Sequence, residues 1–85
     1  MTDIPKLFAD FNNADQHGRI RLNTSGTFAD IKKLNLELKE GMQAFLDDED
    51  SLTTFGHIKY SNEEQIWVAV INWNEIKHND NSSKL

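Results

Sequence analysis

The sequence predicts a mainly β protein: a small, bent antiparallel sheet or a partly open barrel of about five or six strands, with one short helical segment. The strongest observation is the stretch 66–73, which lacks charge, glycine and proline and is typical of a strand apolar on both faces. Apolar and polar residues alternate in 19–22, 34–38 and 42–46, as in half-buried strands. Turn-forming residues separate most of these segments, which favours antiparallel pairing.

The first two strands are expected to form a hairpin. Leu7–Phe11 and Arg19–Leu22 flank the polar segment 12–18, which is rich in turn formers and ends in glycine. In the second strand, two apolar residues alternate with Arg19 and Arg21, so one face enters the core and the other presents two guanidinium groups. We therefore expect an antiparallel pair with a long polar tip.

The segment 27–47 has two interpretations. As a helix, it is capped by Thr27 and its apolar residues fall near one stripe. As extended chain, its leucines alternate with polar residues, and a turn follows at Gly41. A glycine inside a helix costs about 1 kcal/mol, whereas a tight turn needs one. We therefore predict a short helix over 27–34, then two extended pieces, 34–38 and 42–46, joined by a turn at Glu40-Gly41.

The last two strands, Phe55–Tyr60 and Ile66–Trp73, should pair as an antiparallel hairpin through a polar turn at 61–65. Successive side chains of a strand point to opposite sides, so Val68 and Val70 share one face of the final strand. A chain this short builds one core, so one face of this strand serves the core and the other needs a cover. The pattern leaves open which face points outward, and we expect Val68 and Val70 to contribute methyl groups to the core.

The opposite face of the final strand carries Trp67 and Trp73. Burial of one Trp removes about 150–250 Å² from water, worth roughly 4–6 kcal/mol as an upper bound. We therefore expect at least one of them to be buried at a subunit or partner contact, unless segment 27–34 covers both.

Length and charge bound the protein further. Its 85 residues allow one domain with one modest core, which we assign to residues 1–76, and we expect the polar segment 77–85 to be a frayed tail. With 14 acidic and 9 basic residues the formal charge is −5, which disfavours nucleic acid and anionic membranes. Basic or neutral partners are favoured, although the charge also serves solubility by itself.

Composition also excludes several chemistries. The chain has no cysteine, which rules out disulfides, thiolate nucleophiles and cysteine-ligated metal centres. The first residues do not form a signal peptide, and no apolar run approaches the roughly 20 residues of a membrane span. We expect a cytoplasmic protein that does not associate with membranes.

Two stretches carry resemblances to known proteins. Segment 36–46, Leu-Glu-Leu-Lys-Glu-Gly-Met-Gln-Ala-Phe-Leu, resembles the strand, glycine turn and strand of SH3-like barrels. The opening Ile-Pro-Lys-Leu-Phe-Ala-Asp-Phe-Asn-Asn-Ala-Asp at 4–15, continued by 18–24, resembles small uncharacterised bacterial proteins that end in a comparable Trp-Val-Ala strand. The first resemblance implies a small barrel. The second, over residues 4–76, implies a bacterial or mobile-element origin and no particular activity.

Segment 13–20 follows the beginning of an EF-hand calcium loop, with oxygen ligands and a glycine at matching positions. His17 then replaces an oxygen ligand, and Thr24 stands where the bidentate glutamate belongs. The other histidines, His57 and His78, add no metal-ligand spacing. We therefore predict an ordinary turn here and no metal site.

No catalytic constellation is recognisable. Ser25 lies beside a glycine, but no G-x-S-x-G motif surrounds it and no His or carboxylate partner can be identified. With 14 acidic residues, the composition does not exclude general acid–base catalysis by a pair of carboxylates. We predict a protein that is not an enzyme and that needs no cofactor.

The leading hypothesis is a non-enzymatic interaction module that binds and masks a protein partner, as a bacterial or phage inhibitor, an immunity-type protein or a complex subunit. Trp67 and Trp73 would supply aromatic anchors. An acidic loop would guide association electrostatically, and it consists of Asp47, Asp48, Glu49 and Asp50.

Two alternatives belong to other classes. One is a structural homodimer closed by the tryptophan face. The other is a small barrel that binds single-stranded nucleic acid, with Arg19 and Arg21 on the phosphates and a Trp stacked on a base. The competing role for these two arginines is pairing with acidic neighbours across the sheet.

Overall fold

The computed structural model describes residues 4–78. No helix in this part of the chain is long and apolar enough to cross a bilayer. The mainly β composition, with one short α-helix, confirms the predicted fold class. The elements are β1 (Lys6–Phe8), β2 (Ile20–Arg21), α1 (Ser25–Lys33), β3 (Gln43–Asp47), β4 (Leu52–Ser61), β5 (Ile66–Ile71), the 3-10 helix η1 (Trp73–Glu75) and β6 (Lys77–His78).

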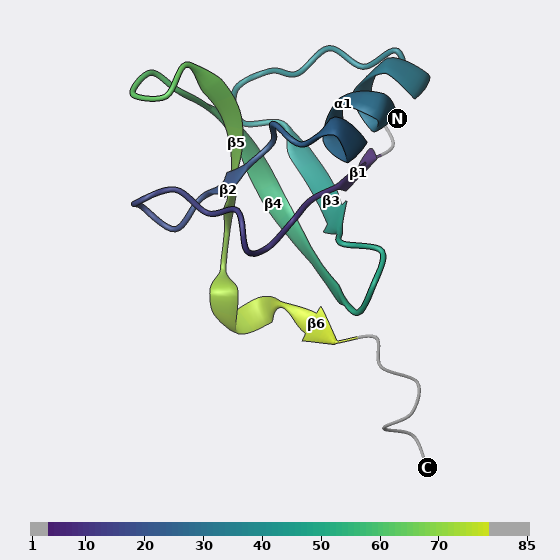
Figure 1. Cartoon of the computed structure of the whole chain (residues 1–85), viewed down its shortest axis with the longest axis vertical. Coiled ribbons are helices and arrows are strands. Elements are labelled where there is room, and N and C mark those ends of the chain that lie inside the picture. The colour runs from purple at the N-terminus through teal and green to yellow at the C-terminus, as the bar shows by residue number, and fades with distance from the viewer. Residues whose placement is uncertain (1–3, 79–85) are drawn as a thin grey trace.

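One sheet contains all of these strands, in the order β1-β3-β4-β5-β2, with β6 paired to β4 off this path. The sheet curls into an open half-barrel, and α1 lies beside β1 at one edge (Figure 1). Its strand pairs are antiparallel except for β1 and β3, which run parallel. The bent, partly open sheet is therefore as predicted, apart from the parallel pair.

The predicted hairpin of Leu7–Phe11 with Arg19–Leu22 is wrong, because β1 pairs with β3 and β2 pairs with β5. A much smaller hairpin exists at the tip, where Ala14 bridges Ile20. Both segments do supply apolar side chains to the core, which is why the local pattern suggested strands. That pattern does not say which strand is the neighbour.

The core lies on one side of the sheet. Its buried apolar side chains are Leu7, Ala9, Phe11, Ile20, Leu22, Ala44, Leu46, Ile58 and Ala69. Trp67 and Ile71 pack against this cluster, so the tryptophan face of β5 is the core face. Val68 is fully buried, but Val70 is 38% exposed. The assignment of Val70 to the core is therefore wrong, because a strand apolar on both faces does not reveal which one the core will take.

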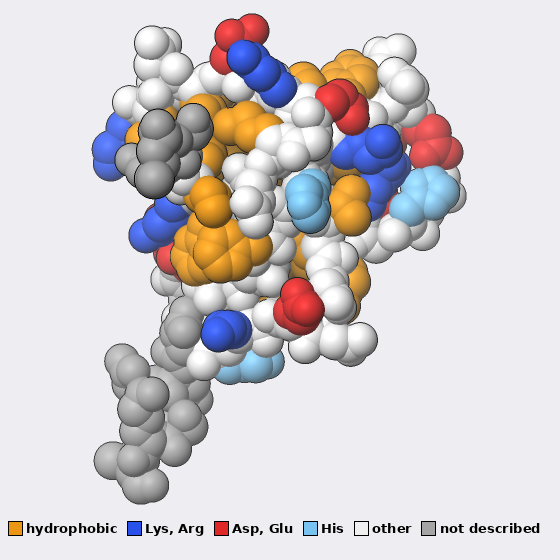
Figure 2. All heavy atoms as spheres, turned by 180° about the vertical axis from the view of Figure 1, so that it is seen from behind, with side chains coloured by type: hydrophobic (Ala, Val, Ile, Leu, Met, Phe, Trp, Pro, Cys, Tyr) orange, Lys and Arg blue, Asp and Glu red, His pale blue; other side chains and the backbone are white. Residues whose placement is uncertain are grey.

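The outer face of the sheet keeps hydrophobic side chains at the surface. Seen from behind, the molecule shows such side chains grouped among charged and histidine side chains (Figure 2). Phe55 and Val70 are the half-exposed members on β4 and β5.

Helix α1 begins earlier than predicted. Thr24 is its N-cap, and the Thr24 hydroxyl accepts a hydrogen bond from the Thr27 N–H over 3.1 Å. Thr27, the expected cap, is buried in the first turn, and its hydroxyl donates to the carbonyl of Phe8 over 2.7 Å. Thr24 thus supplies the capping oxygen, which releases Thr27 to bind the neighbouring strand.

The end of α1 explains why the predicted strand 34–38 is absent. Asn35 has a φ of +51°, and the Leu36 N–H donates to the Ile31 carbonyl over 3.0 Å. This is a Schellman motif, which terminates a helix with a left-handed residue. The chain then runs on without a strand partner, while Leu36 and Leu38 pack against the core. The alternation of leucines with polar residues in 34–38 therefore reflects packing against the core and not pairing in a sheet.

Both glycines predicted in turns adopt the left-handed backbone, with φ of +78° at Gly18 and +81° at Gly41. The long final strand is shorter than predicted, because β5 stops at Ile71. Trp73 instead begins η1, whose first turn is capped by the Asn72 side chain. Beyond position 76, β6 continues the sheet to His78, and the rest of the expected tail lies outside the described residues.

Side chains and loops cover the edges of the two outer strands. On β1, the Phe8 N–H donates to Asp30 over 2.7 Å, and the Phe8 carbonyl accepts from Thr27. On β2, the Arg21 N–H donates to the Asn13 carbonyl over 2.9 Å. Unpaired edge groups are what an added strand would bind, so these contacts close the sheet to strand addition at both positions.

Candidate protein-interaction surface

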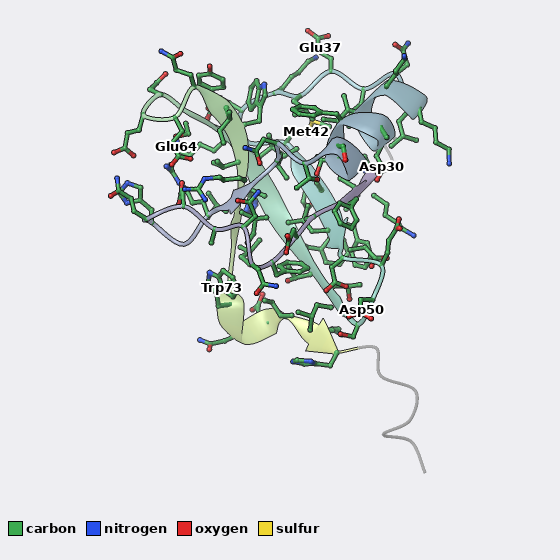
Figure 3. The ribbon with its side chains drawn as sticks, viewed as in Figure 1. Asp30, Glu37, Met42, Asp50, Glu64 and Trp73 are labelled. Carbon is green, nitrogen blue, oxygen red and sulfur yellow. The ribbon has the colours of Figure 1, made fainter. Side chains whose placement is uncertain are left out.

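The structure separates the residues predicted to form one binding surface. Trp67 lies near the start of β5, whereas Trp73 follows the end of that strand. Trp73 and Asp50 lie at the end of the molecule opposite to Glu37 (Figure 3). The two tryptophans and the acidic loop therefore do not form a single site.

Trp73 is 46% exposed and holds a loop in place. Its indole Nε1–H donates to the carbonyl of Gly18 over 2.9 Å. A Cβ atom at Gly18 would lie 3.3 Å from this nitrogen, so the glycine allows both the positive φ and the close approach. The indole thus connects the end of β5 to the tip of the 15–19 turn.

The acidic loop is organised by its own carboxylates. Asp48 accepts hydrogen bonds from the N–H groups of Asp50, Ser51 and Leu52, each over 2.9 Å. Burial acts to raise the pKa of the Asp48 carboxyl, but these hydrogen bonds outweigh it and hold the pKa below its usual value. Asp47 forms an ion pair with Lys6 over 3.5 Å.

Only part of the acidic loop 47–50, which was predicted to guide association, is therefore exposed to solvent. Glu49 and Asp50 are exposed, whereas the carboxylates of Asp47 and Asp48 are engaged in the turn and its ion pair. A charge that already has close partners contributes less to long-range attraction.

Arg19 and Arg21 both have acidic partners. Arg19 Nε donates to Asp15 over 2.8 Å, and the side chain of Asp15 is almost fully buried. Arg21 binds Glu64 through two hydrogen bonds of 2.7 and 2.9 Å. The hydrogen bonds from Arg21 hold the pKa of the Glu64 carboxyl below its usual value. Both arginines thus pair with acidic residues, which is the structural alternative to phosphate binding given above.

Asn13 and Asp15 stand at the first and third ligand positions of the EF-hand-like segment 13–20, but the Asp15 carboxylate accepts hydrogen bonds from its own turn. Besides Arg19 Nε, it accepts the backbone N–H groups of His17 and Arg19, each over 2.9 Å. Among residues 4–78, no group of three or more His, Asp or Glu side chains is placed to hold a metal ion.

An apolar hollow lies between α1, the segment 36–38 and the paired ends of β4 and β5. We call it the α1 groove, and its volume is about 570 Å³. Tyr60 and Trp67 meet edge to face in it, with ring centroids 5.2 Å apart. Its lining consists of Leu22, Phe28, Ile31, Leu36, Glu37, Leu38, Tyr60, Gln65, Ile66 and Trp67.

Local structure explains how these residues converge. Phe28 and Ile31 are three residues apart on α1, so they share one side of the helix. The Schellman turn at Asn35 reverses the chain and brings Leu36 and Leu38 along the same side of the molecule. Phe28 remains 56% exposed at this position. Sequence reasoning named Trp67 alone, because the other groove residues are scattered along the chain.

The electrostatics of the α1 groove are simple. Glu37 is the one charged residue in the described lining. Tyr60 and Gln65 supply the remaining polar side-chain groups. The groove is thus an apolar hollow with a single negative charge, on a protein whose net charge is −5.

No family model matches this chain, and no curated protein or solved structure shows significant similarity to it.

Proposed function

We propose that this protein is a non-enzymatic interaction module that uses the α1 groove to bind and cover a surface of a protein partner. The observation that carries the proposal is the groove itself, an apolar hollow of about 570 Å³ with a half-exposed Phe28 among its residues. Aromatic side chains in hollows are where binding energy concentrates in protein interfaces. Trp67 keeps the anchoring role expected from the sequence, now together with Tyr60 and Phe28.

The form of the partner follows from the rest of the surface. Because edge groups of β1 and β2 are covered at Phe8 and Arg21, we expect the partner to bind through side chains and not as a strand added to β1 or β2. Glu37 and the net charge of −5 favour a lysine or arginine beside the apolar residue that enters the groove. A small acidic module of this kind suits a bacterial or phage inhibitor, an immunity-type protein or a subunit of a larger complex.

A displayed library of random peptides tests this proposal and does not require the partner to be identified first. Selection on the purified chain should enrich peptides with a large apolar residue next to Lys or Arg. Phe28→Ser should weaken the selected peptides at least about tenfold, or about 1.4 kcal/mol. Phe28 is more than half exposed, so this change should leave the fold intact.

Phe55→Ser is the matched control, because Phe55 is 53% exposed and does not line the α1 groove. Circular dichroism and urea unfolding of both variants would verify that they fold. Selection without enrichment, or equal affinity of the wild type and Phe28→Ser for the selected peptides, would contradict the proposal.

A further inference from the structure

A second apolar surface lies on the outer face of the sheet and shares no residue with the α1 groove. Phe55 on β4 is 53% exposed and meets Phe45 on β3 edge to face, with ring centroids 4.9 Å apart. Val70, 38% exposed, lies beside His57, its register partner, on the same face. We call this surface the Phe55 face, and the rear view in Figure 2 shows hydrophobic side chains grouped there.

The path of the chain after β5 makes this face uneven. The pairing of β4 with β5 ends at Gly56 and Ile71, and the pairing with β6 resumes at Thr53 and Lys77. Between these points the chain detours through η1, so no strand flanks Phe55 on that side. The detour leaves a hollow on each side of the Phe55 ring.

The two hollows have volumes of about 420 and 340 Å³, and Phe55 and Glu75 line both of them. Lys77 also lines the larger one, where Thr53, Thr54 and Ile76 form part of the wall. The Phe55 face therefore presents the exposed Phe55 ring beside a hollow large enough to hold an aromatic ring. The acid Glu75 and the base Lys77 lie in the same patch.

We propose that a second copy of this chain docks on the Phe55 face, forming a two-fold symmetric dimer. In such a dimer both subunits use the same patch, so the patch must contain each feature together with its complement. Here the Phe55 ring of each copy enters the larger hollow of the other. The same symmetry brings Lys77 of each copy toward Glu75 of the other.

The local charge of the patch allows a second copy to dock. Two chains of net charge −5 repel each other at long range, so a dimer needs a contact surface that adds no further like-charge repulsion. The lining of the larger hollow is balanced, with one acid and one base. The covered edges of β1 and β2 disfavour self-association by strand addition at these two strands, and face-to-face packing avoids them. Because the patch is small, we expect a weak dimer with a dissociation constant in the micromolar range.

Sedimentation equilibrium of the full chain, from about 1 µM to about 1 mM, tests the dimer. The wild type should show a monomer–dimer equilibrium. Phe55→Ser should raise the dissociation constant at least tenfold, while Phe28→Ser should leave it unchanged. A wild type that stays monomeric throughout, or a dimer that Phe55→Ser does not weaken, would overturn the inference.

A charge exchange tests the symmetry independently of burial. Lys77→Glu should weaken the dimer because two acids then face Glu75 and its counterpart across the interface. The double variant Glu75→Lys, Lys77→Glu should restore association, since the two charges are merely exchanged. Failure of the double variant to recover relative to Lys77→Glu would contradict the proposed pairing. Peptide binding by the α1 groove is measured separately, so either proposal can fail without the other.

Discussion

Two turns of this molecule are each built around one aspartate, and they differ in what else that aspartate binds. Asp48 accepts three backbone N–H groups of its own loop. Asp15 accepts two backbone N–H groups and, in addition, the guanidinium of Arg19. Asp15 is 7% exposed, whereas Asp48 is partly exposed. In both turns the aspartate carboxylate organises the backbone of its own loop, but only Asp15 also holds a buried cationic side chain.

The Asp15 turn is also tied to a distant part of the sheet. Glu63, in the turn between β4 and β5, accepts from Gln16 over 3.0 Å and lies 2.9 Å from His17 Nε2. The nearby Arg21–Glu64 pair joins the same two regions. The Asp48 turn, by contrast, is held by contacts between neighbours in sequence. We therefore expect the Asp15 turn to contribute more to the free energy of unfolding than the Asp48 turn does.

The largest effect is expected from Asp15→Ala. It removes the acceptor of three hydrogen bonds and leaves the mostly buried Arg19 without its closest partner. Loss of such a pair should lower the free energy of unfolding by about 2–4 kcal/mol. Urea denaturation measures this value. Asp15→Asn keeps an oxygen acceptor for the backbone and should cost less, and an alanine variant as stable as the wild type would break the comparison.

Asp48→Ala should cost less, about 1–2 kcal/mol, because it removes a side-chain acceptor of three backbone N–H groups at a partly exposed turn and leaves no buried charge without a partner. The same urea measurement applies. If Asp48→Ala proves more costly than Asp15→Ala, local turn geometry matters more than the buried ion pair.

Acid should weaken the wild type through both aspartates. Burial acts to raise the pKa of Asp15, but its hydrogen bonds from Arg19 and His17 hold the net pKa below the usual value, as the N–H groups do for Asp48. The unfolded chain then binds protons first, so the stabilisation present above about pH 4 is lost as pH falls through the lower folded values. Urea midpoints at about pH 6 and pH 3 should differ less for Asp15→Asn than for the wild type.

The smallest effect is expected where the acidic loop is free. Glu49→Gln and Asp50→Asn alter exposed side chains and should change the free energy of unfolding by less than about 0.5 kcal/mol. A larger loss from either variant in urea would mean that the exposed half of the loop also organises the turn.

The parts of the fold that the sequence predicted are those set by neighbouring residues. The β4–β5 hairpin, the turns at Gly18 and Gly41 and the single helix follow from local alternation and turn chemistry. The partner of β1 could not be predicted, because its pairing with β3 depends on a distant segment. The core face of β5 was equally hidden, since both faces are apolar.

The candidate surfaces were harder to predict than the fold. Trp67 was named from its residue type and does line the α1 groove, but Trp73 was placed on the same strand face and instead begins η1. Asn35 was the overlooked signal, because an asparagine after an apolar stripe, followed by leucine, marks a Schellman end. Had Asn35 been interpreted as the end of the helix, the strand 34–38 would not have been predicted and Leu36 would have been placed beside the helix.

The parallel pairing of β1 with β3 bears on the order in which the sheet assembles. β3, β4 and β5 follow one another along the chain, so their contacts close short loops, whereas β1 reaches β3 only after the intervening chain is placed. Phe8 also binds Asp30 and Thr27 of α1, so β1 needs the helix as well. We expect the Phe45 amide, bonded to the Pro5 carbonyl, to exchange hydrogen faster than the Ile58 amide, bonded to the Met42 carbonyl. On this basis β1 joins the sheet after β3, β4 and β5 have paired with one another.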